Sequence, residues 1–206
     1  MKSTFFAILT LLTSVGANAQ TISEFFIPSA PNNKATLYTP SQTGGRTGMT
    51  RVIYYIKKGD YFEITDAPMM DGQPSSIQTR TVTLTNNEVR MTKSVSTTMF
   101  ETNRQRTHNP PIVLLAMPAN GQTKKWSYTQ ISGDVVNCTT TWTTVNVDNQ
   151  ELKAIKLEEE VVDGFGISIE YYVQGIGLWK TDFKGSDGKV QPFERFDQLS
   201  NDPTAR

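Results

Sequence analysis

The side chains that could do covalent chemistry are few in this sequence. Cys138 is its single cysteine and His108 its single histidine, and no HExxH or CxxC pattern occurs. A nucleophile needs a base beside it, and nothing near either residue supports a Cys–His pair. We interpret Cys138 as a small buried hydrophobic residue and His108, in the loop-like stretch RTHNPP, as an incidental surface histidine. A zinc site would need carboxylates to complete it, and the sequence predicts no metal site.

The LEEE run, Leu157 to Glu160, places three carboxylates in a row. Paired carboxylates serve as general acid and base in glycosidases when they lie about 5 to 10 Å apart. On a strand, Glu159 points to the opposite face from Glu158 and Glu160, so both faces would carry charge. A solvated strand edge explains this arrangement more simply, because charges on an edge discourage aggregation. The sequence therefore predicts that the protein is not an enzyme and has no catalytic residues.

The Gly175-x-Gly177 pair is the remaining pattern that could bind a cofactor. A dinucleotide fingerprint needs a third glycine and a following helix, whose N-terminal amides hold the pyrophosphate. Here the third glycine is missing and the chain continues as LWKTDF, which has the composition of a strand. We expect no cofactor, and we interpret Gly175 and Gly177 as structural glycines that kink a strand and let a wide sheet curl.

Alternating apolar and polar residues predict strands along most of the chain. Ile167, Ile169, Tyr171 and Val173 occupy every second position of one such segment. The threonine-rich stretches TRTVTLT and CTTTWTT suit a pleated surface, and turn signals such as Asp163-Gly164 separate the segments at regular intervals. The predicted fold class is all-β: a curved antiparallel meander that forms a half-open β-barrel or a sandwich-like sheet.

Two segments are predicted to interrupt this meander. The polar stretch Thr97 to Pro111 ends in two prolines and indicates a connector. Pro192 cannot donate to a sheet ladder, so we expect the C-terminal tail to form an edge strand or a short appended segment. A repeated spacing of proline, lysine and tyrosine on either side of the connector predicts two related meanders, at about 24–96 and 112–183.

The N-terminal residues predict export. Lys2 precedes the apolar run Phe5 to Val15, and Ala17-Asn18-Ala19 has the small-x-small pattern of a cleavage site. We expect a signal peptide at 1–19, a single β domain at 20–206 and no transmembrane segment. The 20 basic and 20 acidic residues balance, which argues against nucleic acid or an anionic membrane as a partner.

Five aromatic residues on the predicted strands are the candidate ligand-binding residues. They could line a cavity, stack on sugar rings or form the core. These residues are Trp126, Tyr128, Trp142, Tyr172 and Trp179.

The stretches KKWSYT, ELKAIKLE and EYYVQGIGLWK resemble a C-terminal pattern of exported bacterial β proteins, over Lys124 to Phe183. The pattern is distantly similar to periplasmic lipoprotein carriers of the LolA and LolB type. The resemblance implies a Gram-negative source and a half-open barrel with an apolar cavity. We therefore expect a non-catalytic periplasmic or secreted binding or carrier module for an apolar small molecule or an envelope protein. A structural or adhesive component of a cell-surface assembly is the alternative, followed by a hydrolase acting on glycans.

Overall fold

The fold is a single curved antiparallel sheet with one short helix inside it. The computed structural model describes residues 20–43, 45–98, 104–130 and 132–204, so the predicted signal peptide at 1–19 lies outside the described residues. The elements are α1 (Ile22–Phe26), β1 (Lys34–Pro40), β2 (Arg46–Lys58), β3 (Tyr61–Met70), β4 (Gln73–Pro74), β5 (Ser76–Leu84), β6 (Glu88–Thr98), β7 (Arg104–Ala116), β8 (Lys124–Thr129), β9 (Val135–Val147), β10 (Gln150–Val161), β11 (Gly166–Val173), β12 (Gly177–Gly185) and β13 (Val190–Ser200). Within these ranges no helix is long and apolar enough to cross a membrane.

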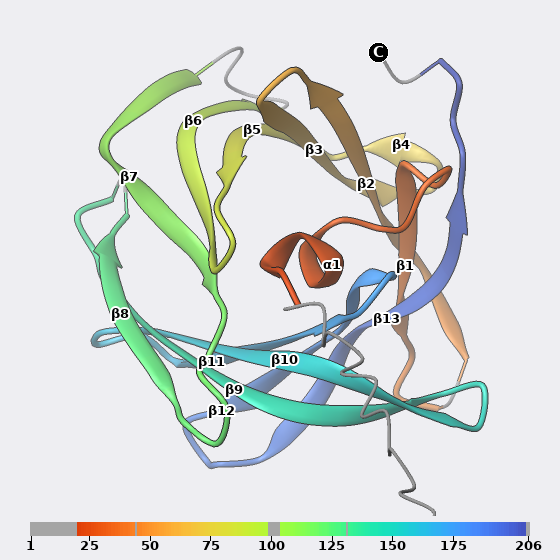
Figure 1. Cartoon of the computed structure of the whole chain (residues 1–206). Coiled ribbons are helices and arrows are strands. Elements are labelled where there is room, and N and C mark those ends of the chain that lie inside the picture. Colours follow the sequence, from red (N-terminus) through yellow and green to blue (C-terminus); the bar gives the residue numbers. More distant parts are fainter. Residues whose placement is uncertain (1–19, 44, 99–103, 131, 205–206) are drawn as a thin grey trace, which may run out of the picture.

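The strands follow one another around a ring (Figure 1). The sheet order is β7-β6-β5-β3-β2-β1-β13-β12-β11-β10-β9-β8, with β4 paired to β3 off this path. The first and last strands, β1 and β13, are paired, and β7 and β8 form the two ends of the order. The predicted all-β, curved antiparallel fold is confirmed, and the sheet is more nearly closed than the half-open barrel that we expected. The internal repetition of two meanders stays a prediction.

Side chains rather than a backbone ladder hold the seam between β7 and β8. The indole Nε1 of Trp126 on β8 donates to the carbonyl of Val113 on β7 at 2.9 Å. From β9, the Thr140 hydroxyl donates to the Ala116 carbonyl at 2.8 Å, and the indole of Trp142 donates to the Pro118 carbonyl at 2.9 Å. Buried carbonyls need such partners, so Trp126 and Thr140 satisfy carbonyls on the edge of β7 that no strand covers, and Trp142 satisfies one in the segment that follows β7.

The α1 helix plugs one end of the barrel, where Figure 1 shows it inside the ring of strands. Ile22, Phe25 and Phe26 are buried, and the Phe25 ring packs edge-on against Trp142 with the ring centroids 5.3 Å apart. The Ile22 amide donates to the carbonyl of Asn86, in the turn between β5 and β6, at 2.9 Å. Contacts from turns on both sides of the ring therefore fix the plug.

Gly175 lies in the turn between β11 and β12, and Gly177 is the first residue of β12, next to the plug. Their φ angles are +78° and +85°, a region that glycine adopts without a side-chain clash. The Gly175 amide donates to the Glu24 carbonyl at 2.7 Å, and a Cβ on Gly177 would stand 3.2 Å from the carbonyl oxygen of Phe26. The expected kink within one strand is therefore a hairpin turn, which lets the backbone approach α1 closely.

The predicted connector at Thr97 to Pro111 was wrong over most of its length. β6 runs to Thr98 and β7 starts at Arg104, while residues 99–103 lie outside the described residues. The pairing moves from Met91↔Ile112 to Lys93↔Thr107, so a bulge of β7 contains the Pro110-Pro111 pair. Because β7 is an end strand with a bulge, its prolines interrupt no central ladder.

The expected edge position of the tail was also wrong. β13 is paired with β1 on one side and with β12 on the other. Pro192 is accommodated because the pairing with β1 begins only at Arg195, and because the β12–β13 register shifts beside Asp182. At Pro192 itself β13 is therefore paired with β12 but not with β1. The sequence alone could not show this one-sided pairing.

Replacing Thr140 with valine tests the seam. The change Thr140→Val keeps the shape of the side chain but removes the donor to Ala116, and it should lower the free energy of unfolding by about 1–3 kcal/mol because a buried carbonyl loses its partner. Thr141→Val is the matched control, since no hydrogen bond of the Thr141 hydroxyl occurs among the described residues. Urea denaturation of both variants measures the effect, and equal stabilities would contradict this account of the seam.

Candidate ligand-binding site

A cavity of about 530 Å³ fills the part of the barrel that α1 leaves free. Its floor, next to α1, is apolar and mostly buried. Phe26 of the plug forms part of this floor. The strand residues that complete it are Ile53, Tyr55, Ile64, Met91, Ile112, Leu114, Leu157, Tyr172 and Leu178.

Polar side chains form a collar above this floor, toward the end of the barrel away from α1, which we call the mouth. Gln130 and Ser132 on this side are exposed and His108 is half-buried, so the lining changes from buried and apolar to accessible and polar. Such a gradient suits a molecule with an apolar body and a polar head. The other collar residues are Arg51, Asp66, Gln78, Arg80, Ser94, Glu159 and Glu170.

One wall of the collar is a network of ion pairs. Arg51 binds the Asp66 carboxylate through Nε at 2.9 Å and Nη2 at 2.6 Å, and its Nη1 binds Glu194 at 2.8 Å. Arg80 lies 3.4 Å from Asp66 and donates twice to the side-chain amide oxygen Oε1 of Gln78, at 2.8 and 2.6 Å. The bidentate geometry is the strong form of this interaction.

The pKa values of this network reflect its pairing. Burial opposes the charge of Arg51, but hydrogen bonds to Asp66 and the charges of Asp66 and Glu194 outweigh it and raise the guanidinium pKa. Burial likewise works to raise the pKa of Asp66, yet the hydrogen bonds and charge of Arg51 and the charge of Arg80 lower it. Arg51 and Asp66 are therefore both held in their ionised forms at neutral pH.

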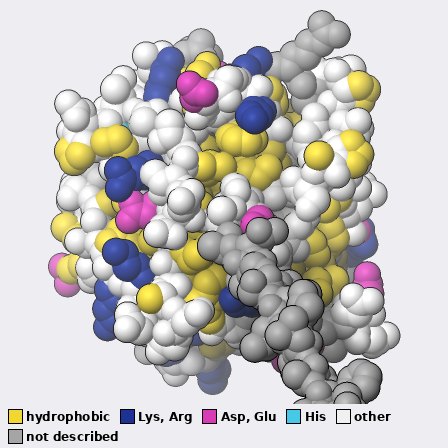
Figure 2. All heavy atoms as spheres, in the orientation of Figure 1, with side chains coloured by type: hydrophobic (Ala, Val, Ile, Leu, Met, Phe, Trp, Pro, Cys, Tyr) yellow, Lys and Arg dark blue, Asp and Glu magenta, His cyan; other side chains and the backbone are white. Residues whose placement is uncertain are grey.

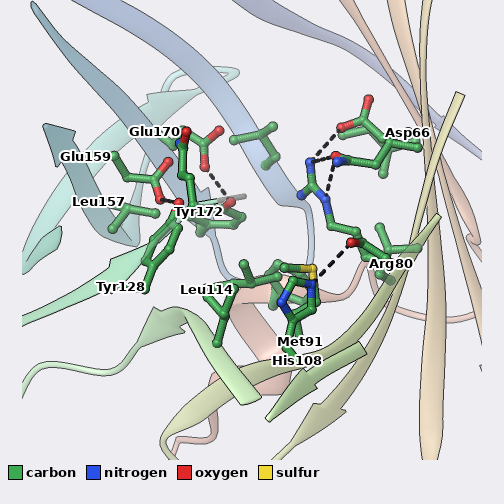
Figure 3. A pocket seen from close by; sticks show the side chains of 18 of the residues that line it. Asp66, Arg80, Met91, His108, Leu114, Tyr128, Leu157, Glu159, Glu170 and Tyr172 are labelled. Carbon is green, nitrogen blue, oxygen red and sulfur yellow. Dashed lines mark hydrogen bonds and ion pairs between the residues drawn. The ribbon is translucent and has the colours of Figure 1, made fainter. Parts of the chain in front are cut away.

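The opposite wall carries two carboxylates, Glu159 and Glu170 (Figure 3). Leu157 faces Glu170 across the β10–β11 ladder and Glu159 is two positions further on, so both carboxylates lie on the inner face as diagonal neighbours. The Tyr128 hydroxyl donates to Glu159 at 3.2 Å and the Tyr172 hydroxyl donates to Glu170 at 2.5 Å. No lysine or arginine of the described residues forms an ion pair with either carboxylate.

This arrangement shifts the protonation of Glu159. Burial raises the pKa of its carboxyl to about 7, and the negative charge of Glu170 adds to the rise. The Cys138 thiol lies 3.9 Å from the same carboxylate, and burial raises its pKa to about 12. Cys138 is thus an unreactive buried thiol at neutral pH, as the sequence indicated.

His108 lies at the collar and not, as expected, on the outer surface. Its Nε2 is 3.2 Å from the Ser94 hydroxyl, and burial together with the charge of Arg106 lowers the imidazole pKa. In the described ranges no carboxylate binds the other ring nitrogen, so nothing orients the imidazole as a base. Nor do three His, Cys, Asp or Glu side chains gather there to hold a metal ion.

The five aromatic candidates separate into two groups. Tyr128 and Tyr172 line the cavity, whereas the three tryptophans do not. Trp126 and Trp142 pack against the main core and donate across the seam, and Trp179 stacks on Phe196 with a centroid distance of 4.8 Å.

Sequence reasoning missed most of the charged lining, above all Glu159. The interpretation of LEEE as a solvated strand edge was wrong, because β10 is paired on both sides, with β9 and β11. Glu158 and Glu160 do face outward, and Lys156 pairs with Glu158 at 2.7 Å. The signal that could have found the site is the shared face of Leu157 and Glu159, which places a carboxylate directly beside a core residue.

Exposed apolar side chains gather at the mouth end of the barrel. In the antiparallel meander, the turns near 41–45, 71–75, 132–134, 162–165 and 186–188 lie at this end. Nine of the ten large apolar residues that are exposed in the described ranges lie on or near these turns, including Phe165, which is 91% exposed. The full set of this apolar rim is Met49, Met70, Ile77, Val135, Val162, Phe165, Phe183, Val190 and Phe193. The face in Figure 2 also shows hydrophobic side chains, with scattered basic and acidic side chains between them.

Comparisons with known proteins show likeness of fold only. No protein-family model matches the chain, and no curated protein matches its sequence. Two solved structures are similar: one from Bacteroides fragilis, described as an exported protein with a YmcC-like fold (12% identity, TM-score 0.48), and one from Parabacteroides distasonis, described as a lipoprotein (9% identity, TM-score 0.48). Each alignment covers 86% of this chain and 99% of the other. These values describe the path of the chain and carry no argument about a ligand.

The raised pKa of Glu159 predicts a pH-dependent stability. Between pH 4.5, the usual value of the group, and about 7, the folded state binds a proton that the unfolded state has released. The contribution of Glu159 to the free energy of unfolding therefore falls as pH rises through this window. Glu159→Gln should remove that fall and stabilise the protein at pH 8 by about 1–3 kcal/mol, since one pKa unit corresponds to ~1.4 kcal/mol.

Urea denaturation at pH 5 and pH 8 measures this effect. Glu160→Gln is the matched control, because Glu160 is exposed on the outer face of the same strand. If the Glu159→Gln variant and the wild type lost the same free energy of unfolding between pH 5 and pH 8, another group would control the pH dependence of stability.

Proposed function

We propose that this chain is a non-catalytic binding or carrier module, periplasmic or secreted, whose barrel holds a small molecule with an apolar body. The observation that carries the proposal is the graded cavity, closed by α1 at its apolar end and polar toward the mouth. Its volume of about 530 Å³ falls within the range of roughly 300–1,000 Å³ that is typical of small-molecule sites. The location rests on the predicted signal peptide.

The shape of the barrel supports binding over the structural or adhesive alternative. An adhesive module would join other chains through a long strand edge with free backbone groups. Here the edge of β7 at the seam receives side-chain donors from Trp126 and Thr140, and Trp142 donates to Pro118 just after the strand. The apolar rim lies around the mouth, where a carrier would take up and release its ligand.

Catalysis has less support, because the collar groups are committed to each other. Arg51 and Asp66 are paired, and Glu159 and Glu170 lie side by side on adjacent strands rather than on opposite sides of a bound substrate. A glycosidase needs its two carboxylates to flank the scissile bond.

Blocking the cavity tests the proposal. The mature chain, residues 20–206, should bind the neutral fluorescent dye Nile red, and Leu114→Trp should weaken that binding by about tenfold or more, ~1.4 kcal/mol, because the indole occupies the floor. Val113→Trp is the control, since Val113 is adjacent in sequence but does not line the cavity. Fluorescence titration gives the affinities, with circular dichroism to confirm folding.

Native mass spectrometry of the mature chain from its own host extends the test. A stoichiometric adduct that organic extraction removes would support the carrier function. Nile red binding that Leu114→Trp and Val113→Trp weaken equally would place the dye elsewhere and contradict the proposal.

A further inference from the structure

The charges of the cavity are balanced on one wall and unbalanced on the other. Arg51, Arg80, Asp66 and Glu194 contribute two positive and two negative charges within one network of contacts at 2.6 to 3.4 Å. This wall is neutral as it stands. Arg51 already uses Nε, Nη1 and Nη2, so its guanidinium has little capacity left for a ligand anion.

Within the part of the chain that the structure describes, the hydrogen-bond donors to Glu159 and Glu170 are neutral. Glu159 receives the Tyr128 hydroxyl and the Cys138 thiol, and Glu170 receives the Tyr172 hydroxyl. A carboxylate in a protein interior is stable when a cation is paired with it. Among the described residues Arg80 is the cation that influences Glu159, and it is not within ion-pair distance. The charge of Glu170 also acts on Arg51, yet among the described residues no lysine or arginine forms an ion pair with either carboxylate.

From this imbalance, and resting on the proposed function, we infer that the ligand carries a cationic nitrogen, such as a protonated amine, which Glu159 and Glu170 bind. The head group would lie between the two carboxylates on the β10–β11 wall. The apolar body would then extend over Leu157 and Leu178 toward Phe26 of the plug.

The residues beside the carboxylates suit this orientation. Figure 3 shows Tyr128 and Tyr172 next to Glu159 and Glu170, on the side of the cavity opposite Asp66 and Arg80. Aromatic rings attract a cation over their faces, by about 0.5–2 kcal/mol. Leu157 precedes Glu159 by two positions and shares its face, so the same strand supplies the head-group contact and the first apolar contact.

Binding of a cation should be linked to pH. An ammonium favours the ionised form of Glu159, whose pKa of about 7 means that the empty site is partly protonated at neutral pH. Amine affinity should therefore rise between pH 6 and pH 8, while the amine itself stays protonated. The titratable or charged groups that face Glu159 are Glu170 and Tyr172 from β11, Tyr128 from β8, Cys138 from β9 and Arg80 from β5.

Three probes that share the same alkyl chain but differ in head group isolate the contribution of the head group to binding. Decylamine, decanol and decanoate share an unbranched chain and differ in charge, and displacement of Nile red at pH 8 ranks them. We expect decylamine to bind at least about tenfold more tightly than decanol, because the ammonium forms charge-assisted hydrogen bonds to the carboxylates. Decanoate should bind more weakly than decanol, because it meets two carboxylates.

Variants assign the preference to the two glutamates. The double variant Glu159→Gln with Glu170→Gln should bind decylamine no better than decanol. Glu160→Gln, on the outer face of β10, should keep the full preference. Circular dichroism and Nile red affinity confirm that each variant is folded and that its cavity is intact.

The outcomes separate this inference from the proposed function. Equal displacement by the three probes, or stronger displacement by decanoate, would overturn the cationic ligand and leave the binding module in place. A preference for decylamine that survives the double variant would overturn the role of the two glutamates. Failure of Nile red and of every probe to bind would overturn the proposed function, and the inference with it.

Discussion

The size of the barrel is the constraint on which the rest of the structure depends. A barrel of about eight strands has an interior that its own side chains can fill. Here twelve strands form the ring, so the inward-facing residues cannot meet across the centre. The chain fills one end with α1, whose Phe25 and Phe26 supply large apolar side chains. The space that remains is the cavity, which therefore follows from the strand number and the length of the plug.

An interior of this kind needs polar groups that are paired, because an ion removed from water loses its hydration. The two walls meet this requirement in different ways. Arg51 and Asp66 form an ion pair within the chain. Asp66 raises the pKa of Arg51 and Arg51 lowers the pKa of Asp66, so both charged forms are stabilised. Glu159 instead has a raised pKa and becomes neutral by binding a proton. One wall is thus fixed in charge, while the other can change its charge near neutral pH.

The sequence predicted the presence of strands better than it predicted which strands pair with one another. Period-two alternation and turn residues depend on local chemistry, and they identified the all-β meander in advance, although the kink expected within a strand at Gly175 and Gly177 is a hairpin turn. Whether a strand is central or at an edge depends on pairing between distant segments. For that reason Pro192 suggested an edge although β13 lies between β1 and β12. Pro110 and Pro111 likewise suggested a connector, although a bulge on an end strand accommodates them.

The same limit explains why Glu159 was not recognised. Three consecutive glutamates on a strand put charge on both faces, and a sequence cannot show which face encloses a cavity. The structure resolves this by register: Leu157 lies in the core and Glu159 shares its face. Locally, a leucine or glutamine would suit this interior position better, so the carboxylate reduces stability at neutral pH and above. Side chains that break a local rule in this way concentrate at functional sites, and Glu159, a buried carboxyl with a raised pKa, is such a residue.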